Sequence, residues 1–357
     1  MTNINIELLK KTEEKEWDEF VVNHPLGRFS QTTAFKRVLE ETYGYRSNFI
    51  VLKRGEKIIG IFPLFWWRDI FGKTHLVSVP FADYGGPLNE EISGEEAKSF
   101  IEFLKNILSE YGASFLKVNS GLELALQKNL ERHFLKKGNN QRAVLKLEKP
   151  DILWEKFDRS VRKCVNAAQR EKLNCLMETS PAAISHDFYP LYLSSMKRLG
   201  TPPHPPSYFL NKLKYFSGDM KLFLVRFGSK TIAVLLGFAI GNTVQITKTA
   251  SDPRYWLKRP NDLAHWEFIK WSSENNYQYF DFGPVRYENQ LRYKMKWGAQ
   301  ISENYNYYLT DASDGKVFLK DSSESSLLFK CFSKIWSCLP GCLSQKIGPF
   351  IRKNMGR

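Results

Sequence analysis

The pattern of hydrophobic and polar residues predicts both strands and helices in the first third of the chain. Apolar and aromatic residues favour a β-hairpin from Asn48 to Trp67, with its turn at Gly55-Glu56-Lys57. A third strand is predicted from His75 to Val79. Apolar residues at positions 97, 100, 101, 104, 107 and 108 have helical spacing, which predicts a helix from Glu95 to Tyr111. Ser114 to Val118 is predicted as another strand.

The same order of elements returns in the second half. A hairpin around Gly228 is followed by predicted strands at Thr243–Ala250 and Tyr277–Phe282, with a predicted helix, Asn261–Glu274, between them. Four pairs of residues recur at an offset of 173 positions: Gly55 and Gly228, Lys57 and Lys230, Phe65 and Phe238, and Pro87 and Pro260, each of these prolines just ahead of its helix. So short a pattern also arises by chance in proteins of this class, but the shared offsets favour an internal duplication.

Two basic segments lie outside this repeat. Trp154 to Lys172 is predicted as one helix, with apolar residues on one face and basic residues on the other. The chain ends in a basic stretch with apolar residues at helical spacing, interrupted at Pro340-Gly341. We therefore predict an α+β protein of three parts: an N-terminal domain at 1–148, a C-terminal domain at 149–312 that carries the basic helix 154–172, and a basic amphipathic helical tail at 313–357.

The tail has two interpretations that its sequence does not separate. Basic amphipathic helices bind anionic lipid surfaces, so residues 324–357 predict a peripheral contact with an anionic membrane. Helices with the same pattern also pack their apolar face on the body of their own protein.

The composition of the chain narrows the classes of partner to expect. The formal net charge of the 357 residues is +14, which favours anionic partners such as nucleic acid, phosphorylated substrates or a membrane face, although a generally basic protein has the same charge. The five cysteines show no zinc-binding spacing, and their odd number fits a reducing compartment. No signal peptide and no run of eighteen apolar residues is evident. We expect a cytoplasmic protein, with peripheral contact at the inner face of the plasma membrane if the tail binds lipid.

The stretch Tyr277–Gly298 is the strongest candidate for chemistry. Its predicted strand stops at Gly283-Pro284, and a basic, aromatic segment follows, which we expect to be an exposed loop. Such loops past a strand end commonly hold ligands. The segment contains four basic residues: Arg286, Arg292, Lys294 and Lys296. His204, between two proline pairs, is a further candidate for a pocket, whereas His265 on an amphipathic helix is expected to be structural.

Several blocks of sequence resemble one family. They are Phe81–Pro87, Ser160–Ala168, Leu199–Pro205 and Phe280–Gly283 with Arg292–Gly298. In this order they are similar to the signature blocks of Fem-like (FemABX) peptidyltransferases, in particular the branch associated with exopolysaccharide and exosortase loci. The resemblance covers roughly residues 10–310. It implies two tandem GNAT-like (acyl-CoA N-acyltransferase-like) domains, and an enzyme that moves an amino acid from aminoacyl-tRNA to an amine of a peptidoglycan precursor.

The resemblance also implies roles for individual residues. Lys294 matches the lysine of the family's Phe-Lys block, with Tyr293 in place of the phenylalanine, and would meet the transferred acyl group or the terminal phosphates of tRNA. Asp83, followed by Tyr84, lies in the block near the acceptor. Asp83 can equally be a turn residue, and Lys294 a solvated surface lysine. The basic residues Arg162, Lys163 and Arg170 either bind phosphates or form a solvated helix face.

Three functions follow as expectations. The first is an N-acyl or aminoacyl transferase acting on an anionic envelope or sugar precursor, with tRNA or another activated acyl donor as partner and no bound cofactor. The second, less favoured, is an acyl-CoA-dependent N-acyltransferase. The turn before the second helix, Leu257–Asp262, contains no glycine with which to cradle a pyrophosphate. The third is a non-catalytic scaffold at the membrane. The sequence does not indicate an oligomeric state.

Overall fold

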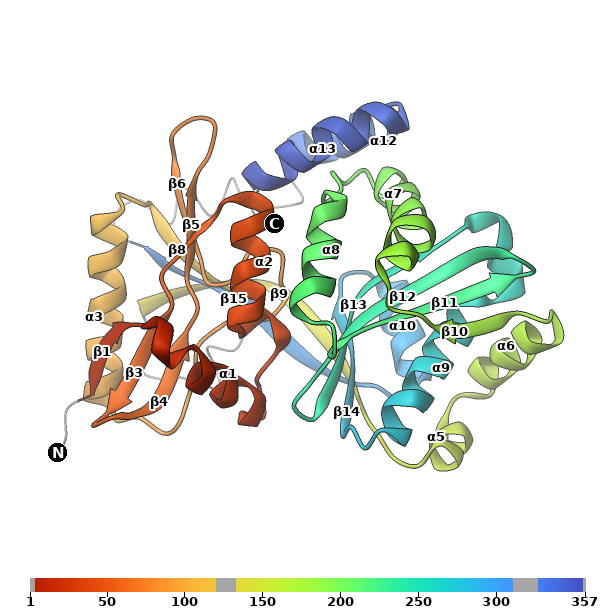
Figure 1. Ribbon diagram of the computed structural model, residues 1–357, viewed down its shortest axis with the longest axis horizontal. Helices are drawn as coiled ribbons and strands as arrows, with labels where there is room; N and C mark the ends of the chain where they lie inside the picture. The colour runs from red at the N-terminus through yellow and green to blue at the C-terminus, as the bar shows by residue number, and fades with distance from the viewer. Residues whose placement is uncertain (1–3, 120–132, 311–326, 356–357) are drawn as a thin grey trace. The chain divides into compact units, whose positions relative to one another are not determined.

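The computed structural model describes residues 4–119, 133–310 and 327–355 of the chain (Figure 1). The chain forms two compact units, each built from separated segments. The first unit consists of residues 1–139, 304–331 and 352–357. The second consists of residues 140–303 and 332–351.

The described residues 4–119 and 304–310 of the first unit form two groups of strands and three α-helices. An antiparallel sheet has the strand order β1 (Asn5–Leu8), β3 (Ile50–Arg54), β4 (Lys57–Phe62) and β7 (Leu88–Asn89). A second run of paired strands has the order β2 (Arg46–Ser47), β5 (Phe65–Arg68), β6 (Thr74–Val77), β8 (Phe115–Asn119) and β15 (Gln300–Thr310). The helices are α1 (Glu14–Asn23), α2 (Thr33–Tyr43) and α3 (Gly94–Glu110).

The predicted helix of the first repeat is confirmed as α3. Ser93 and Glu96 form a capping box at its start, and all six apolar positions that predicted the helix are buried. They pack against residues from both groups of strands, such as Phe62 and Leu116. The predicted second hairpin strand is instead split at Pro63-Leu64 into β4 and β5, which join different groups of strands. Pro63 has no N–H with which to continue a ladder.

The second unit is one run of strands with helices packed on it. Its strand order is β10 (Asn174–Met177), β11 (Met220–Phe227), β12 (Lys230–Ile240), β13 (Thr243–Ser251), β14 (Tyr279–Val285) and β9 (Phe134–Lys146). The helices are α5 (Pro150–Lys156), α6 (Arg159–Arg170), α7 (Tyr189–Arg198), α8 (Pro206–Tyr215), α9 (Pro260–Glu274) and α10 (Glu288–Lys296). A π-helical turn, Ala183–Phe188, precedes α7.

Both units repeat the same strand pattern. β6 and β8 are parallel neighbours in the first unit, as are β13 and β14 in the second, and their other neighbours are antiparallel. Gly55 and Gly228 occupy equivalent hairpin turns with positive φ angles of 64° and 59°. The correspondence of the two prolines is wrong in detail: Pro260 is the first residue of α9, whereas Pro87 precedes the short strand β7.

Two predicted elements differ from the structure. The single helix predicted at 154–172 is two helices, because Phe157 is extended and the Asp158 side chain accepts a hydrogen bond (2.7 Å) from the Ser160 backbone N–H, which starts α6. The segment predicted as a basic loop is the helix α10.

The tail forms α12 (Leu327–Cys338) and α13 (Gly341–Met355), separated where the sequence predicted a break. Within the second unit, Trp336 and Ser344 are buried, and a Cβ atom on Gly348 would lie 2.4 Å from Cδ of Pro203. One face of the tail therefore packs on the second unit. Among the helices of the described segments, none is both long and apolar enough to cross a membrane.

Candidate active site

The parallel strands β13 and β14 part from each other in the second unit. They pair at only three positions, Thr243 with Tyr279, Val244 with Phe280 and Gln245 with Asp281, although both strands continue beyond this point. The pairing of β14 with β9 also shifts register between Asp281 and Pro284. Backbone N–H and C=O groups that lose a ladder partner must find another one, so a separation of this kind can accept a ligand's amide or carbonyl groups.

Two buried polar side chains mark the last paired position. Val244 and Phe280 lie in the apolar core formed with α9, so the next residues, Gln245 and Asp281, lie on the opposite face of the sheet. Gln245 is 4% exposed, and its Oε1 accepts no hydrogen bond from the described residues. Asp281 is fully buried, and its Oδ1 accepts from the Gly283 backbone N–H at 2.8 Å. A buried amide oxygen without a partner is costly, which marks this position for a ligand or water.

Lys294 reaches the end of β14 from α10. Its Nζ donates hydrogen bonds to the backbone oxygens of Gly283 (3.0 Å) and Pro284 (2.7 Å), and the residue is only 9% exposed. The prediction of an exposed loop is therefore wrong, because Lys294 is a buried residue on a helix. The structure places its positive charge just beyond the point where β13 and β14 part.

The residue next to Lys294 connects α10 to α9. The Tyr293 hydroxyl lies 3.2 Å from Nδ1 of His265, which in turn lies 2.7 Å from the Asn261 backbone oxygen. Burial lowers the pKa of His265 to about 4, so its ring is neutral at pH 7. Burial and the nearby Asp262 carboxylate raise the pKa of Tyr293 well above its usual range. These neutral groups fix α10 on α9, and so fix the position of Lys294.

The other predicted basic residues lie on the surface of the second unit. Lys163, Arg170, Arg286, Arg292 and Lys296 are exposed, and Arg162 is half-buried. The charges of Lys296 and Arg162 both act on Asp158 at the start of α6, although hydrogen bonds from Ser160 are the main reason for its lowered pKa. Arg292 bonds Glu288 on its own helix at 3.0 Å. The structure thus brings Arg162 and Lys296 to the same side chain.

His204 is fully buried in the loop before α8. Its ring stacks on Tyr208 at 4.1 Å, and the hydroxyl of Tyr192 accepts a hydrogen bond from its backbone N–H at 2.9 Å. The structure places this predicted pocket residue within a cluster of packed aromatic rings.

Asp83 and Tyr84 belong to the first unit, in the loop between β6 and β7. Tyr84 is buried, and its backbone oxygen accepts from Ser30 Oγ at 2.7 Å. Asp83 is half-buried, and its backbone oxygen lies 3.5 Å from Nδ2 of Asn304. The loop is thus held by side chains from distant parts of the first unit.

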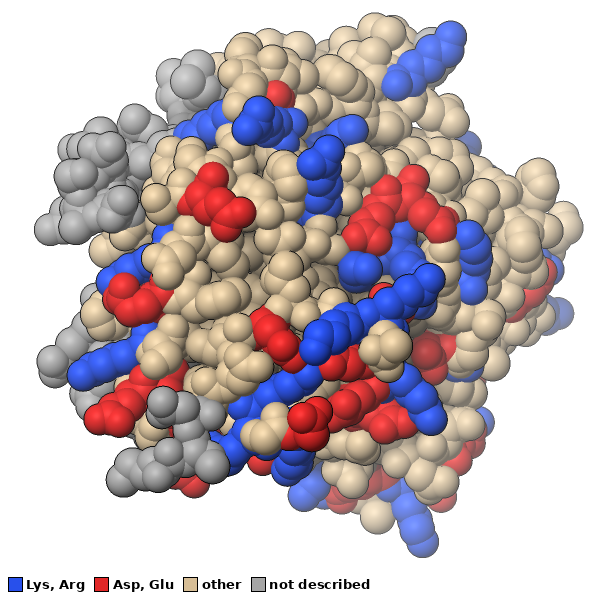
Figure 2. Space-filling view, turned by 60° about the vertical axis from the view of Figure 1, so that its left-hand side comes forward, with Lys and Arg blue, Asp and Glu red and all other residues tan. Residues whose placement is uncertain are grey.

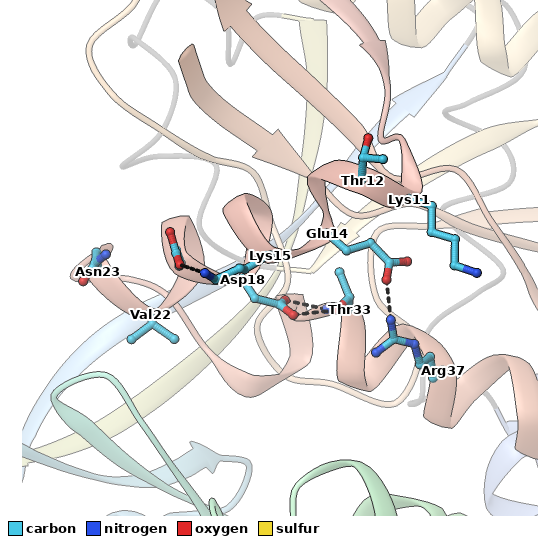
Figure 3. Close-up of a pocket in the computed structure, with 10 residues that line it drawn as sticks. Lys11, Thr12, Glu14, Lys15, Asp18, Val22, Asn23, Thr33 and Arg37 are labelled. Atoms are coloured by element: carbon cyan, nitrogen blue, oxygen red, sulfur yellow. Dashed lines mark hydrogen bonds and ion pairs between the residues drawn. The ribbon is translucent and has the colours of Figure 1, made fainter. Parts of the chain in front are cut away.

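Neither the surface charge nor a hollow on the first unit offers a better site. On the face shown in Figure 2, acidic and basic side chains are interspersed, so the net charge of +14 forms no single patch there. The hollow in Figure 3, beside α1 and α2, has a volume of about 760 Å³ and a largely charged lining. Its main groups already bind one another: Asp18 accepts from Thr33 at 2.6 and 2.8 Å, and Glu14 pairs with Arg37.

Comparisons with known proteins identify the fold. Residues 155–295 match the acetyltransferase (GNAT) domain family. The chain therefore contains a GNAT-type domain. The structure is also similar to the crystal structure of FemX, with 16% identity, a TM-score of 0.71, and coverage of 89% of this chain and 100% of FemX. No curated protein sequence matched.

Two further solved structures have the same fold. One is a tandem GNAT protein from the clavulanic acid biosynthesis pathway (9% identity, TM-score 0.54, 86% of this chain and 98% of that chain). The other is L-PGS from Bacillus licheniformis (11% identity, TM-score 0.51, 85% and 97%). At these identities the likeness establishes the fold, so the predicted α+β fold with tandem GNAT-like domains is confirmed.

Gln245 and Asp281 were missed by the sequence analysis. A signal was present, because Gln245 and Asp281 each stand between two apolar residues of a strand, Val244 and Ile246 or Phe280 and Phe282. Reading it required knowing that the two strands are neighbours.

Proposed function

We propose that the protein is a Fem-type N-acyl or aminoacyl transferase. It would transfer an activated amino acid or acyl group to an amine of a cell-envelope or exopolysaccharide precursor. The observation that carries the proposal is the buried ammonium of Lys294 beyond the separation of β13 and β14, next to the polar pair Gln245 and Asp281. The resemblance of the sequence to Fem-like proteins supports aminoacyl-tRNA as the donor.

The chemistry requires stabilisation of a developing negative charge, which a cation at such a position can supply. The acceptor nitrogen attacks the carbonyl carbon of the acyl ester, a C–N bond forms, the ester C–O bond breaks, and the amine proton is passed to the departing hydroxyl group. Negative charge develops on the carbonyl oxygen in the transition state. Lys294 would stabilise this oxyanion, since fixed positive charge in a buried site is most effective there. The role of Asp83 near the acceptor amine stays a prediction of the sequence resemblance.

Features at the start of α9 favour aminoacyl-tRNA over acyl-CoA as the donor. Pro260, the first residue of α9, has no N–H to offer a phosphate. Asp262 lies in the first turn, where a carboxylate would repel a phosphate, although burial raises its pKa. Arg259 holds the left-handed conformation at which glycine is favoured. An acyl-CoA-dependent enzyme is the second candidate, supported by the match of residues 155–295 to the acetyltransferase (GNAT) domain.

Replacing Lys294 tests the proposal. Lys294→Met keeps the side-chain length and removes the charge, so we expect transfer to fall by about 10²-fold or more. Its two carbonyl partners lose a donor, and stability should fall by roughly 1–3 kcal/mol, which a thermal melt measures. The matched control is Lys105→Met, an exposed lysine of α3. Turnover of Lys294→Met within threefold of the unaltered enzyme, at a temperature where both are folded, would remove Lys294 from the mechanism.

The donor is tested by ligand-induced stabilisation. Aminoacyl-tRNA should raise the melting temperature of the full chain more than uncharged tRNA or CoA, since a ligand that binds the native state stabilises it. Stabilisation by CoA alone would favour the second candidate. If no donor stabilises the protein and no transfer occurs, a non-catalytic scaffold is the better description.

A further inference from the structure

The turn between β5 and β6 presents two apolar side chains to solvent. Ile70 is 61% exposed and Phe71 is 87% exposed, at the tip of a hairpin that extends from the first unit (Figure 1). Large apolar side chains displayed together at a protruding tip indicate a contact surface, because leaving them in water gains nothing for the fold.

The turn is held rigidly in this conformation. Oδ1 of Asp69 accepts hydrogen bonds from the backbone N–H groups of Phe71 (2.9 Å) and Lys73 (3.0 Å). Its other oxygen lies 2.8 Å from Nε2 of His75, and Gly72 takes a φ of 77°. The tip is therefore organised before any partner arrives, so little conformational entropy is lost on binding.

The base of the hairpin is anchored within the first unit. Trp67 stacks on His75 at 5.1 Å and on Tyr45 at 4.5 Å. The Tyr45 hydroxyl donates a 2.5 Å hydrogen bond to the backbone oxygen of Lys353, at the end of α13. These contacts at the base therefore hold the hairpin in place when its tip contacts another surface.

Basic residues flank the apolar tip. Arg68 is exposed and precedes the turn. Lys73 follows it and is half-buried, with its Nζ over the Phe115 ring at 6.0 Å. The acid between them, Asp69, is engaged by the turn and by His75. An apolar tip beside basic side chains complements an anionic lipid interface, where basic residues are attracted to the lipid phosphates and an aromatic side chain enters the headgroup region.

A separate surface in the second unit has the same character. On α13, Leu343, Ile347 and Phe350 are 41%, 37% and 58% exposed at spacings of four and three residues, and Lys346 lies beside them. A neighbouring face of this helix, at Ser344 and Gly348, is buried. The tail therefore packs on the protein and still exposes a basic, apolar face.

We propose that the β5–β6 hairpin inserts Ile70 and Phe71 into the headgroup region of an anionic membrane, with Arg68 against the lipid phosphates. This inference concerns where the protein binds and does not depend on its transferase activity.

Vesicle binding of the full chain tests the proposal. We expect co-sedimentation with vesicles of phosphatidylcholine and phosphatidylglycerol, weak binding to phosphatidylcholine alone, and loss of binding as salt is raised. The double variant Ile70→Ser/Phe71→Ser should bind about tenfold more weakly, because both side chains are already in solvent and only the lipid contact is lost. The matched control is Leu257→Ser, which removes a side chain that is 90% exposed on the second unit.

The possible outcomes distinguish lipid binding through the hairpin from lipid binding through another surface. The double variant and the control should have equal melting temperatures, so weaker binding of the double variant alone supports the proposal. If the double variant binds vesicles as well as the Leu257→Ser control does, the role of the hairpin is overturned. This holds even if Phe350→Ser on α13 weakens binding. Absence of binding by the unaltered protein to anionic vesicles overturns the membrane proposal as a whole, and the tip would then be assigned to a protein partner.

Discussion

In the first unit the Asn119 side chain fills the end of the parallel pair β6 and β8, whereas in the second unit Gln245, Asp281 and Lys294 stand at the end of β13 and β14. Nδ2 of Asn119 donates to the backbone oxygens of Val79 (2.5 Å) and Ala82 (3.1 Å). The first junction thus binds its own loop. At each junction one buried amide oxygen, Oδ1 of Asn119 or Oε1 of Gln245, has no partner among the described residues, but the second junction also has a buried ammonium. One repeat uses the junction for structure, and the other keeps it suited to a ligand.

The largest effect on stability is expected at the first junction. Asn119→Ala leaves two carbonyl groups without a donor, so the free energy of unfolding should fall by about 3 kcal/mol, measured by urea denaturation. Transfer per folded molecule should be unchanged, in contrast to Lys294→Met. Asn275→Ala is the control, because its hydrogen bond to the Trp271 backbone oxygen is exposed. Loss of transfer in folded Asn119→Ala would mean that both junctions take part in catalysis.

A somewhat smaller effect on stability is expected from His265, which joins α9 to α10 through Tyr293, and this effect depends on pH. The folded pKa of His265, about 4, is below the ordinary value of 6.5. Protons therefore bind the unfolded state first, and the stabilisation present above pH 6.5 is lost as pH falls toward 4. Between pH 7 and pH 4.5 this amounts to about 2.5 kcal/mol.

Substitution of His265 should flatten this dependence. Urea denaturation of His265→Gln should show a weaker loss of stability between pH 7 and pH 4.5 than the unaltered protein shows. His186→Gln, at an exposed histidine, should leave the loss unchanged. Identical pH profiles for all three proteins would mean that His265 is not held neutral by burial.

The smallest effect on stability is expected at the two hairpin turns, a feature that both repeats share. Gly55→Ala and Gly228→Ala should each cost about 1 kcal/mol, because both turns need a positive φ angle and a Cβ atom would meet open space in either turn. Chemical denaturation of the two variants measures the costs. A difference of more than 1 kcal/mol between them would show that the turns are not equivalent.

The sequence predicted the elements better than it predicted the site. Regular apolar spacing in α3 and the glycine turns of both hairpins were sufficient, because these features are local. The break at Asp158 was missed, since a capping side chain interrupts a helix without disturbing its apolar spacing. Lys294 was named as a candidate from the sequence but was placed in a loop, because α10 is short, polar and rich in charge. Its burial depends on carbonyl groups of β14, which only the folded chain brings near.

One pairing limits when the first unit can fold. β15 completes this unit by pairing with β8, where Tyr307 lies opposite Val118. The ribosome adds Tyr307 about 190 residues after Val118. The first unit must therefore wait, with one edge of β8 open, until nearly all of the second has been synthesised. Pairing over such a separation is slow, so production of the protein should depend on protection of this edge during translation.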